Sequence, residues 1–180
     1  MTLDEILPLL DTSRAELHDS IEAVPVPLRD ARPAPDRWSV AEVLEHLAIV
    51  ETGVRRVLLT LARDVAGEVR EPGGAPRPGM DLRGLVDRTM RVASLAQAVP
   101  SRGLPWQAAR EELNRSRAEL LAVIASVRHR PIERASRPHY LLGALSGIEW
   151  IEFVARHEQR HAAQVREIGA YMSGIGPGAA

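Results

Sequence analysis

The sequence predicts an all-α protein, a four-helix bundle in which a long, partly structured connection separates the second and third helices. Apolar residues recur at steps of three and four, which is the period of a helix. Alternating runs of β-branched residues, which are typical of strands, are absent. Four such helical segments in one chain predict a single bundle domain over residues 1–173, followed by a flexible tail at 174–180.

The first helix is expected from about Leu3 to Val24, because its apolar residues form a single stripe. Pro25 and Pro27 then stop the helix, since proline cannot continue the hydrogen-bond ladder. The proline-rich stretch that follows, residues 25–37, is predicted to be a loop.

The second helix has a clear start. Ser39 is followed three residues later by Glu42, which is the spacing of a capping box: the serine oxygen accepts a free backbone N–H and the glutamate reaches back. Trp38 precedes this cap and is expected to pack on the first turn. The apolar stripe carries the helix to about Ala66.

The longest irregular part of the chain runs from Gly67 to Gly103. Residues 71–79 alternate proline and glycine with small and charged residues, which predicts a loop. Asp81 to Ala98 has inward-facing apolar positions and is interpreted as an additional helix. A connection of this length permits a crossover, so the sequence leaves the order of the four helices open.

The third helix is predicted from Pro105, a favourable residue for a first turn, to Val127. Residues 128–144 are expected to form a loop. The fourth helix is predicted from about Leu145 to Tyr171, after which glycines and a proline end it.

Composition excludes several classes of chemistry. The chain has no cysteine, and its 23 basic residues are all arginine, so thiolate ligands, a cysteine nucleophile and a Schiff-base lysine are impossible. A net charge of −1 gives no reason to expect a nucleic-acid partner. The absence of a long apolar run or a basic leader predicts a cytoplasmic protein without a membrane partner. The abundance of Arg, Ala, Gly and Pro favours a bacterial source with a GC-rich genome.

The histidines carry the chemical signal. His157 and His161 lie one turn apart on the apolar face of the fourth helix, so both imidazoles project to the same side. His46 lies at the edge of the stripe of the second helix. If these helices are neighbours, three imidazoles with an open fourth position make a site typical of catalytic zinc. The residues alone also allow histidines that are merely hydrogen-bonded in the core.

The same segment satisfies the metalloprotease string H-E-x-x-H, in which Glu158 would be the general base. No histidine follows His161 to supply the third ligand, and predicted strands are missing. We therefore consider the protease interpretation the weaker one.

Three stretches of the chain resemble the DinB-like (DinB/YfiT) superfamily. Residues 37–47 are similar to its second-helix signature, and residues 142–150 with 157–164 are similar to its fourth-helix signature. Residues 98–105 with 117–120 are similar to its third-helix region. The resemblance, which covers nearly the whole chain, implies a four-helix bundle with a buried three-histidine metal site.

Carried over by position, the implied metal ligands are His46, His157 and His161, the same residues that the helical stripes select. Gln164, one turn after His161, and Glu149, eight residues before His157, are candidates to hydrogen-bond the ligands. The expected cofactor is a divalent transition metal, with zinc or nickel preferred. No catalytic side chain is assigned.

The resemblance implies a metal-dependent S-transferase that uses an external low-molecular-weight thiol such as mycothiol and acts on a small-molecule substrate, as a homodimer. A metal with an open position lowers the pKa of a bound thiol, which fits a chain that lacks cysteine. Two alternatives remain: a metal-dependent hydrolase, and a non-enzymatic, stress-related bundle with a structural metal. A fourth protein ligand would favour the structural metal.

Overall fold

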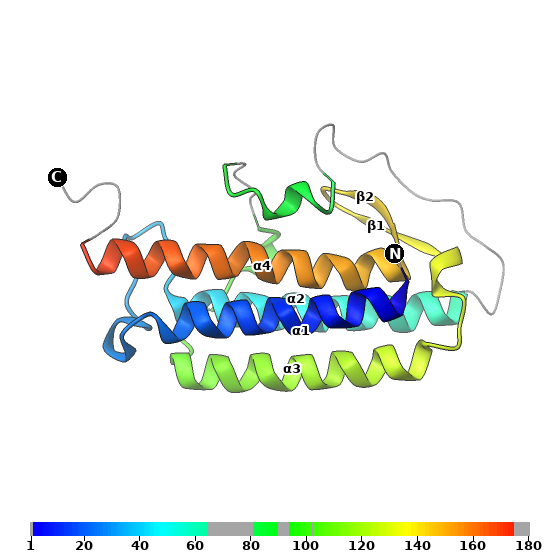
Figure 1. Cartoon of the computed structure of the whole chain (residues 1–180), viewed down its shortest axis with the longest axis horizontal. Coiled ribbons are helices and arrows are strands. Elements are labelled where there is room, and N and C mark those ends of the chain that lie inside the picture. Colours follow the sequence, from blue (N-terminus) through cyan, green and yellow to red (C-terminus); the bar gives the residue numbers. More distant parts are fainter. Residues whose placement is uncertain (1, 65–80, 90–93, 102, 175–180) are drawn as a thin grey trace.

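Four long helices dominate the computed structural model (Figure 1). They are α1 (Leu3–Glu22), α2 (Val40–Asp64), α3 (Trp106–Val127) and α4 (Gly147–Met172). The predicted four-helix bundle is therefore confirmed. None of the described helices is long and apolar enough to cross a membrane. The structure describes residues 2–64, 81–89, 94–101 and 103–174.

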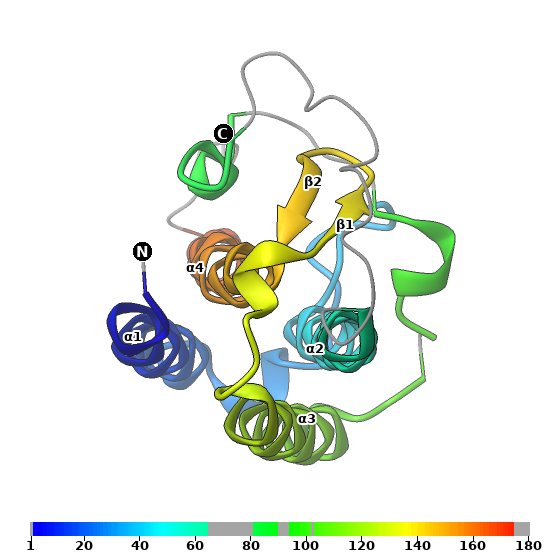
Figure 2. The ribbon, with the colours of Figure 1, turned by 90° about the vertical axis from the view of Figure 1, so that its right-hand side faces the viewer.

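The helices run in two parallel pairs (Figure 1). α1 and α4 point the same way: Ser13 bonds Glu158, and, seven residues later along α1, Ser20 bonds Arg166. α2 and α3 run side by side in the opposite direction, and Figure 2 shows the four helices around a square in the order α1, α4, α2, α3. Because α2 and α3 are parallel, the connection between them is a crossover that returns along the bundle.

The prediction of a helix over residues 81–98 is wrong. The described parts of this segment contain two short 3₁₀ helices, η2 (Gly84–Val86) and η3 (Ala96–Ala98). Side chains compete with a helical ladder here: Asp81 accepts the backbone N–H of Gly84 at 2.6 Å, and Asp87 accepts that of Thr89 at 2.8 Å. The predicted loop at 71–79 and most of the predicted tail lie outside the described residues.

The segment predicted as a loop before α4 contains a small β-hairpin. Strand β1 (Ser136–His139) pairs antiparallel with β2 (Gly143–Ser146). Gly143 has φ 77°, which favours glycine at the end of this three-residue turn. The hairpin lies beside the bundle, next to α4 and α2 and near the start of α4 (Figure 2).

A capping box fixes the start of α4. The hydroxyl of Ser146 accepts the backbone N–H of Glu149 at 3.3 Å, and the Glu149 carboxylate accepts the backbone N–H of Ser146 at 2.8 Å. Because Ser146 is also the last residue of β2, the helix begins at Gly147, two residues later than the apolar stripe predicts.

A buried ionic network joins all four helices at mid-bundle. Arg117 of α3 contacts Glu51 of α2 at 2.6 Å and Glu158 of α4 at 3.0 Å. Arg14 of α1 contacts the same two carboxylates, at 2.9 and 2.7 Å. The side chains of Arg117, Glu51 and Glu158 are at most 9% exposed, so these charges depend on one another for solvation.

The capping box predicted at the start of α2 is confirmed. Ser39 Oγ accepts the Glu42 N–H at 3.2 Å, and Glu42 accepts the Ser39 N–H at 2.9 Å. Ser39→Ala is expected to lower the free energy of unfolding by about 1 kcal/mol, because one N–H of the first turn loses its acceptor. Urea denaturation measures the change, and Ser126→Ala, on the exposed face of α3, is the control that should move it by less than about 0.5 kcal/mol.

Candidate metal centre

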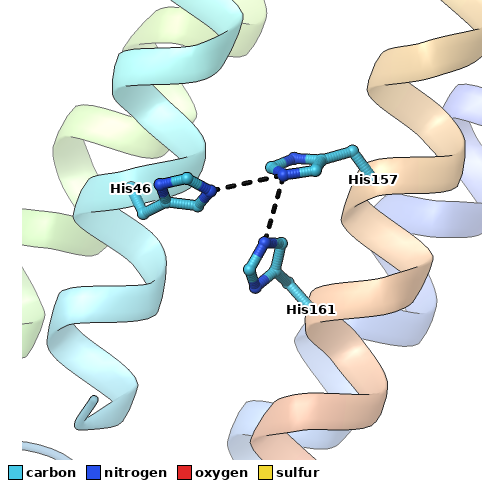
Figure 3. A group of neighbouring side chains, drawn as sticks. All are labelled: His46, His157 and His161. Atoms are coloured by element: carbon cyan, nitrogen blue, oxygen red, sulfur yellow. Dashed lines mark hydrogen bonds between the residues drawn. The ribbon is translucent and has the colours of Figure 1, made fainter. Parts of the chain in front are cut away.

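Three imidazoles converge in the space between α2 and α4. Figure 3 shows His46 projecting from α2 toward His157 and His161, which project together from α4. The Nε2 atom of His157 lies 3.3 Å from Nε2 of His46 and 3.1 Å from Nε2 of His161. All three candidate ligand atoms lie within 4.8 Å of one another. The structure thus brings together the three histidines that the sequence selected.

Hydrogen bonds on the far side of two rings fix which nitrogen carries the proton. Nδ1 of His46 lies 2.7 Å from the backbone carbonyl of Ala98, and Nδ1 of His161 lies 2.8 Å from Oε1 of Gln164. Both oxygens can only accept, so both Nδ1 atoms donate. The Nε2 atoms of His46 and His161 therefore present bare lone pairs to the centre of the cluster.

This arrangement fits a cation. If Nε2 of His157 carries a proton, it can donate to Nε2 of His46 or to Nε2 of His161, but not to both. Without a cation, at least one of the two short contacts would therefore bring two nitrogen lone pairs together. Two nitrogens bound to a tetrahedral ion at 2.0–2.1 Å are roughly 3.3 Å apart, close to both measured separations. Imidazoles with Nδ1–H bonded to an oxygen are the usual form of histidine ligands.

Burial keeps the cluster neutral. It lowers the pKa of His46, although the carbonyl of Ala98 opposes this. The pKa values of His157 and His161 lie well below the ordinary value, first because of burial and then because the neighbouring histidines would repel a second positive charge. Neutral imidazole is the form that ligates a metal.

The other predicted residues take different places. Gln164 bonds His161, as described above. Glu149 closes the capping box of α4, where it bonds Ser146 and not a histidine of the cluster. Glu158, the would-be protease base, is 1% exposed and turned to the other side of α4, where it binds Arg14, Arg117 and Ser13. Its position contradicts the protease interpretation.

The cluster lines a pocket of about 1020 Å³. Part of the wall is apolar and comes from α2, the hairpin turn and α4. Another part is polar and includes Arg37, Arg88, Arg160 and Glu167. Arg88 binds Glu167 with two contacts of 2.6 and 2.7 Å. The apolar residues are Val50, Val54, Val57, Leu141, Trp150 and Phe153.

Sequence reasoning missed three features of this site. Trp38, expected only to pack on the first turn of α2, lies beside His46 with ring centroids 4.9 Å apart. The carbonyl of Ala98 has no sequence signature, because any residue could supply it. His139 lies in the segment predicted to be a loop and was not assigned to the site, but it is 8% exposed and lines the pocket. The hairpin that buries this side chain was not predicted from the sequence.

The hairpin turn holds His139 in one tautomer. The backbone N–H groups of Leu141 and Leu142 both lie 3.2 Å from Nδ1 of His139. Backbone amides only donate, so Nδ1 accepts and the ring proton resides on Nε2. Burial lowers the pKa of His139 to about 4, so the ring is neutral at neutral pH.

His139 should make stability depend on pH. Between about pH 4 and 6.5 the unfolded chain binds a proton that the native His139 excludes, so the free energy of unfolding falls as the pH is lowered through this window. Urea denaturation of the metal-free protein at several pH values measures the slope. His139→Phe is expected to reduce it, and an equal slope in both proteins would show that His139 does not contribute.

Comparison with known proteins places the chain in a family. YuaE, an uncharacterized protein of Bacillus subtilis (strain 168), is 25% identical over 163 residues, covering 90% of this chain and 96% of YuaE. The crystal structure of TT2238, a four-helix bundle protein, has a TM-score of 0.62 at 23% identity, covering 92% of this chain and 98% of that one; it supports the fold alone. Residues 9–165 match the DinB superfamily. The chain therefore belongs to the DinB superfamily.

Proposed function

We propose that this protein is a metal-dependent enzyme whose metal is held by His46, His157 and His161. One observation carries the proposal: three neutral imidazoles converge on the wall of a pocket of about 1020 Å³. A small-molecule site typically measures about 300–1,000 Å³, so the space suits a substrate together with a second reactant. A metal used only for stability needs no such access.

The number of ligands supports catalysis over a structural role. Structural zinc sites usually have four protein ligands, whereas catalytic sites have three and an open position. Within the described part of the chain, the group of candidate ligands consists of the three histidines. Oε1 of Gln164 accepts the Nδ1–H of His161, so this side chain bonds one of the proposed ligands.

Zinc or nickel is the proposed ion, because both accept imidazole nitrogen and the site offers no thiolate. When bound, such an ion supplies a positive charge that lowers the pKa of a thiol or water in its open position. The chain's own contribution is to hold the imidazoles. Ala98 and Gln164 orient two of the rings, and apolar residues keep water away from one side of the pocket.

The proposed reaction is transfer to an external low-molecular-weight thiol. The chain has no cysteine, so a sulfur nucleophile must enter from solution. In the overall reaction the thiol sulfur forms a bond to an electrophilic carbon, the bond from that carbon to its leaving group breaks, and the thiol proton leaves with that group. Hydrolysis is the second candidate, since the same pocket admits water as the nucleophile.

Thiol consumption distinguishes the two reactions. Zinc-loaded protein is incubated with a small electrophile and with glutathione, cysteine or mycothiol in turn, and the loss of free thiol is followed. Faster loss than with metal-depleted protein supports the transferase. Metal-dependent product formation without thiol loss supports the hydrolase. A protein that binds zinc but accelerates neither reaction across a broad panel of electrophiles and esters supports the structural role.

A further inference from the structure

His139 presents a single hydrogen-bond donor to the pocket. Two backbone N–H groups of the hairpin turn occupy Nδ1, which leaves the proton on Nε2. Within the described residues, Nε2 has no hydrogen-bond partner, although the side chain is more than nine-tenths buried and lines the pocket. An N–H group that faces a pocket and has no protein partner is free to donate to an acceptor on a bound molecule.

Aromatic rings surround this donor. The ring centroid of His139 lies 4.7 Å from that of Phe153 and 5.2 Å from that of Trp150. Phe153 in turn stacks on His157, with centroids 5.2 Å apart. A single phenyl ring therefore separates the His139 donor from the three-histidine cluster, and a small molecule can reach both.

The surroundings of the His139 Nε2–H group define which kind of acceptor it can bind. Because burial keeps the imidazole neutral, it offers a hydrogen bond without a positive charge at neutral pH. Its partner must be an acceptor such as a carbonyl or carboxylate oxygen. The wall of the same pocket includes Val54, Val57 and Leu141 as well as the two aromatic rings, so it suits a substrate whose acceptor oxygen is attached to an apolar group.

We propose that His139 orients the substrate by donating its Nε2–H to a substrate oxygen, and that the substrate class is small carbonyl or carboxylate compounds with an aromatic or branched apolar group. This inference rests on the proposed function, because it places the substrate beside the metal. The hairpin then has a functional purpose: its turn selects the tautomer, and its strands hold the ring against α4.

The tautomer is tested first, in metal-free protein. Nitrogen-15 NMR of histidine-labelled protein at pH 7 reports which ring nitrogen carries the proton, and His139→Gln identifies the resonances. The expected result is a protonated Nε2 and a bare Nδ1. A proton on Nδ1, or a charged ring, would overturn the proposal. This measurement needs no metal, so it stands even if the metal site fails.

Ligand binding is tested with phenylacetate, which combines a carboxylate with an aromatic group. Zinc-loaded protein is titrated, and binding is followed by tryptophan fluorescence, because Trp38 and Trp150 line the pocket. His139→Phe keeps an aromatic ring but removes the donor, so the dissociation constant should rise about tenfold or more. His139→Gln restores an N–H near the same place and should bind more tightly than His139→Phe.

His129→Phe, at an exposed position, is the matched control and should bind phenylacetate like the wild type. Equal binding by wild type and His139→Phe would refute the donor role. Absence of phenylacetate binding to zinc-loaded wild type would refute the substrate class. Absence of bound zinc would instead refute the proposed function, and the tautomer measurement would then decide on His139 alone. If His139→Phe does not fold, the comparison is made between wild type and His139→Leu.

Discussion

Arg117→Ala is expected to lower the free energy of unfolding by about 3–5 kcal/mol. The guanidinium contacts Glu51 and Glu158, and it also donates to the carbonyl of Leu10 at 3.0 Å. Burial by itself lowers the pKa of Arg117, but the two carboxylates more than compensate and raise it. Among the described residues, removing this one cation leaves two buried carboxylates with only the partly exposed Arg14 as their cationic partner.

Thermal and urea denaturation measure the loss. For a chain of this size the expected change corresponds to a fall in Tm of about 6–20 °C. Arg115→Ala is the matched control on the same helix: its side chain is 62% exposed and pairs with Glu112, so the change should stay below about 0.5 kcal/mol. If the two variants lose similar stability, the network is not what holds the four helices together.

The His157→Ala/His161→Ala double variant is expected to lose its metal. Wild-type protein exposed to zinc or nickel should retain about one equivalent after desalting, as elemental analysis measures. The variant keeps only His46, and one imidazole cannot hold the ion against dilution. Loss of two imidazole rings between α2 and α4 also leaves a cavity, so circular dichroism must show that the variant is folded before its metal content is compared.

His18→Ala/His129→Ala removes two exposed histidines and is the matched control. It should retain metal like the wild type, which separates specific binding from adsorption to surface imidazoles. Equal metal content in wild type and in the double variant of α4 would falsify the ligand assignment. Loss of metal in the control as well would show that the measured ion is bound at the surface.

Local patterns were sufficient to predict the helices. The cap at Ser39 and the apolar stripes placed α1 to α4 to within a few residues, because both are short-range features of the chain. The same helical spacing predicted that His157 and His161 lie on one face of α4. Applied to Ser146 and Glu149, the capping-box rule would also have placed the start of α4 correctly.

Long-range contacts could not be predicted this way. The strands of the hairpin contain few β-branched or aromatic residues, so their pairing depends on the turn and on packing against α4. That pairing buries His139, which lies in the segment that the sequence predicted to be a loop. The prediction of a helix over residues 81–98 was wrong for a related reason. The apolar spacing of a helix is present, but the side chains of Asp81 and Asp87 accept backbone N–H groups in turns instead.

The order of the helices also has a consequence during protein synthesis. His46 and His157 are 111 residues apart, and α1 packs against α4, which leaves the ribosome after the other three bundle helices. A nascent chain can pair α2 with α3 early, but it holds only one imidazole of the cluster until α4 emerges. At about 5–20 residues per second, several seconds separate these events. Metal loading is therefore a late step, completed only when the newly made chain closes its bundle.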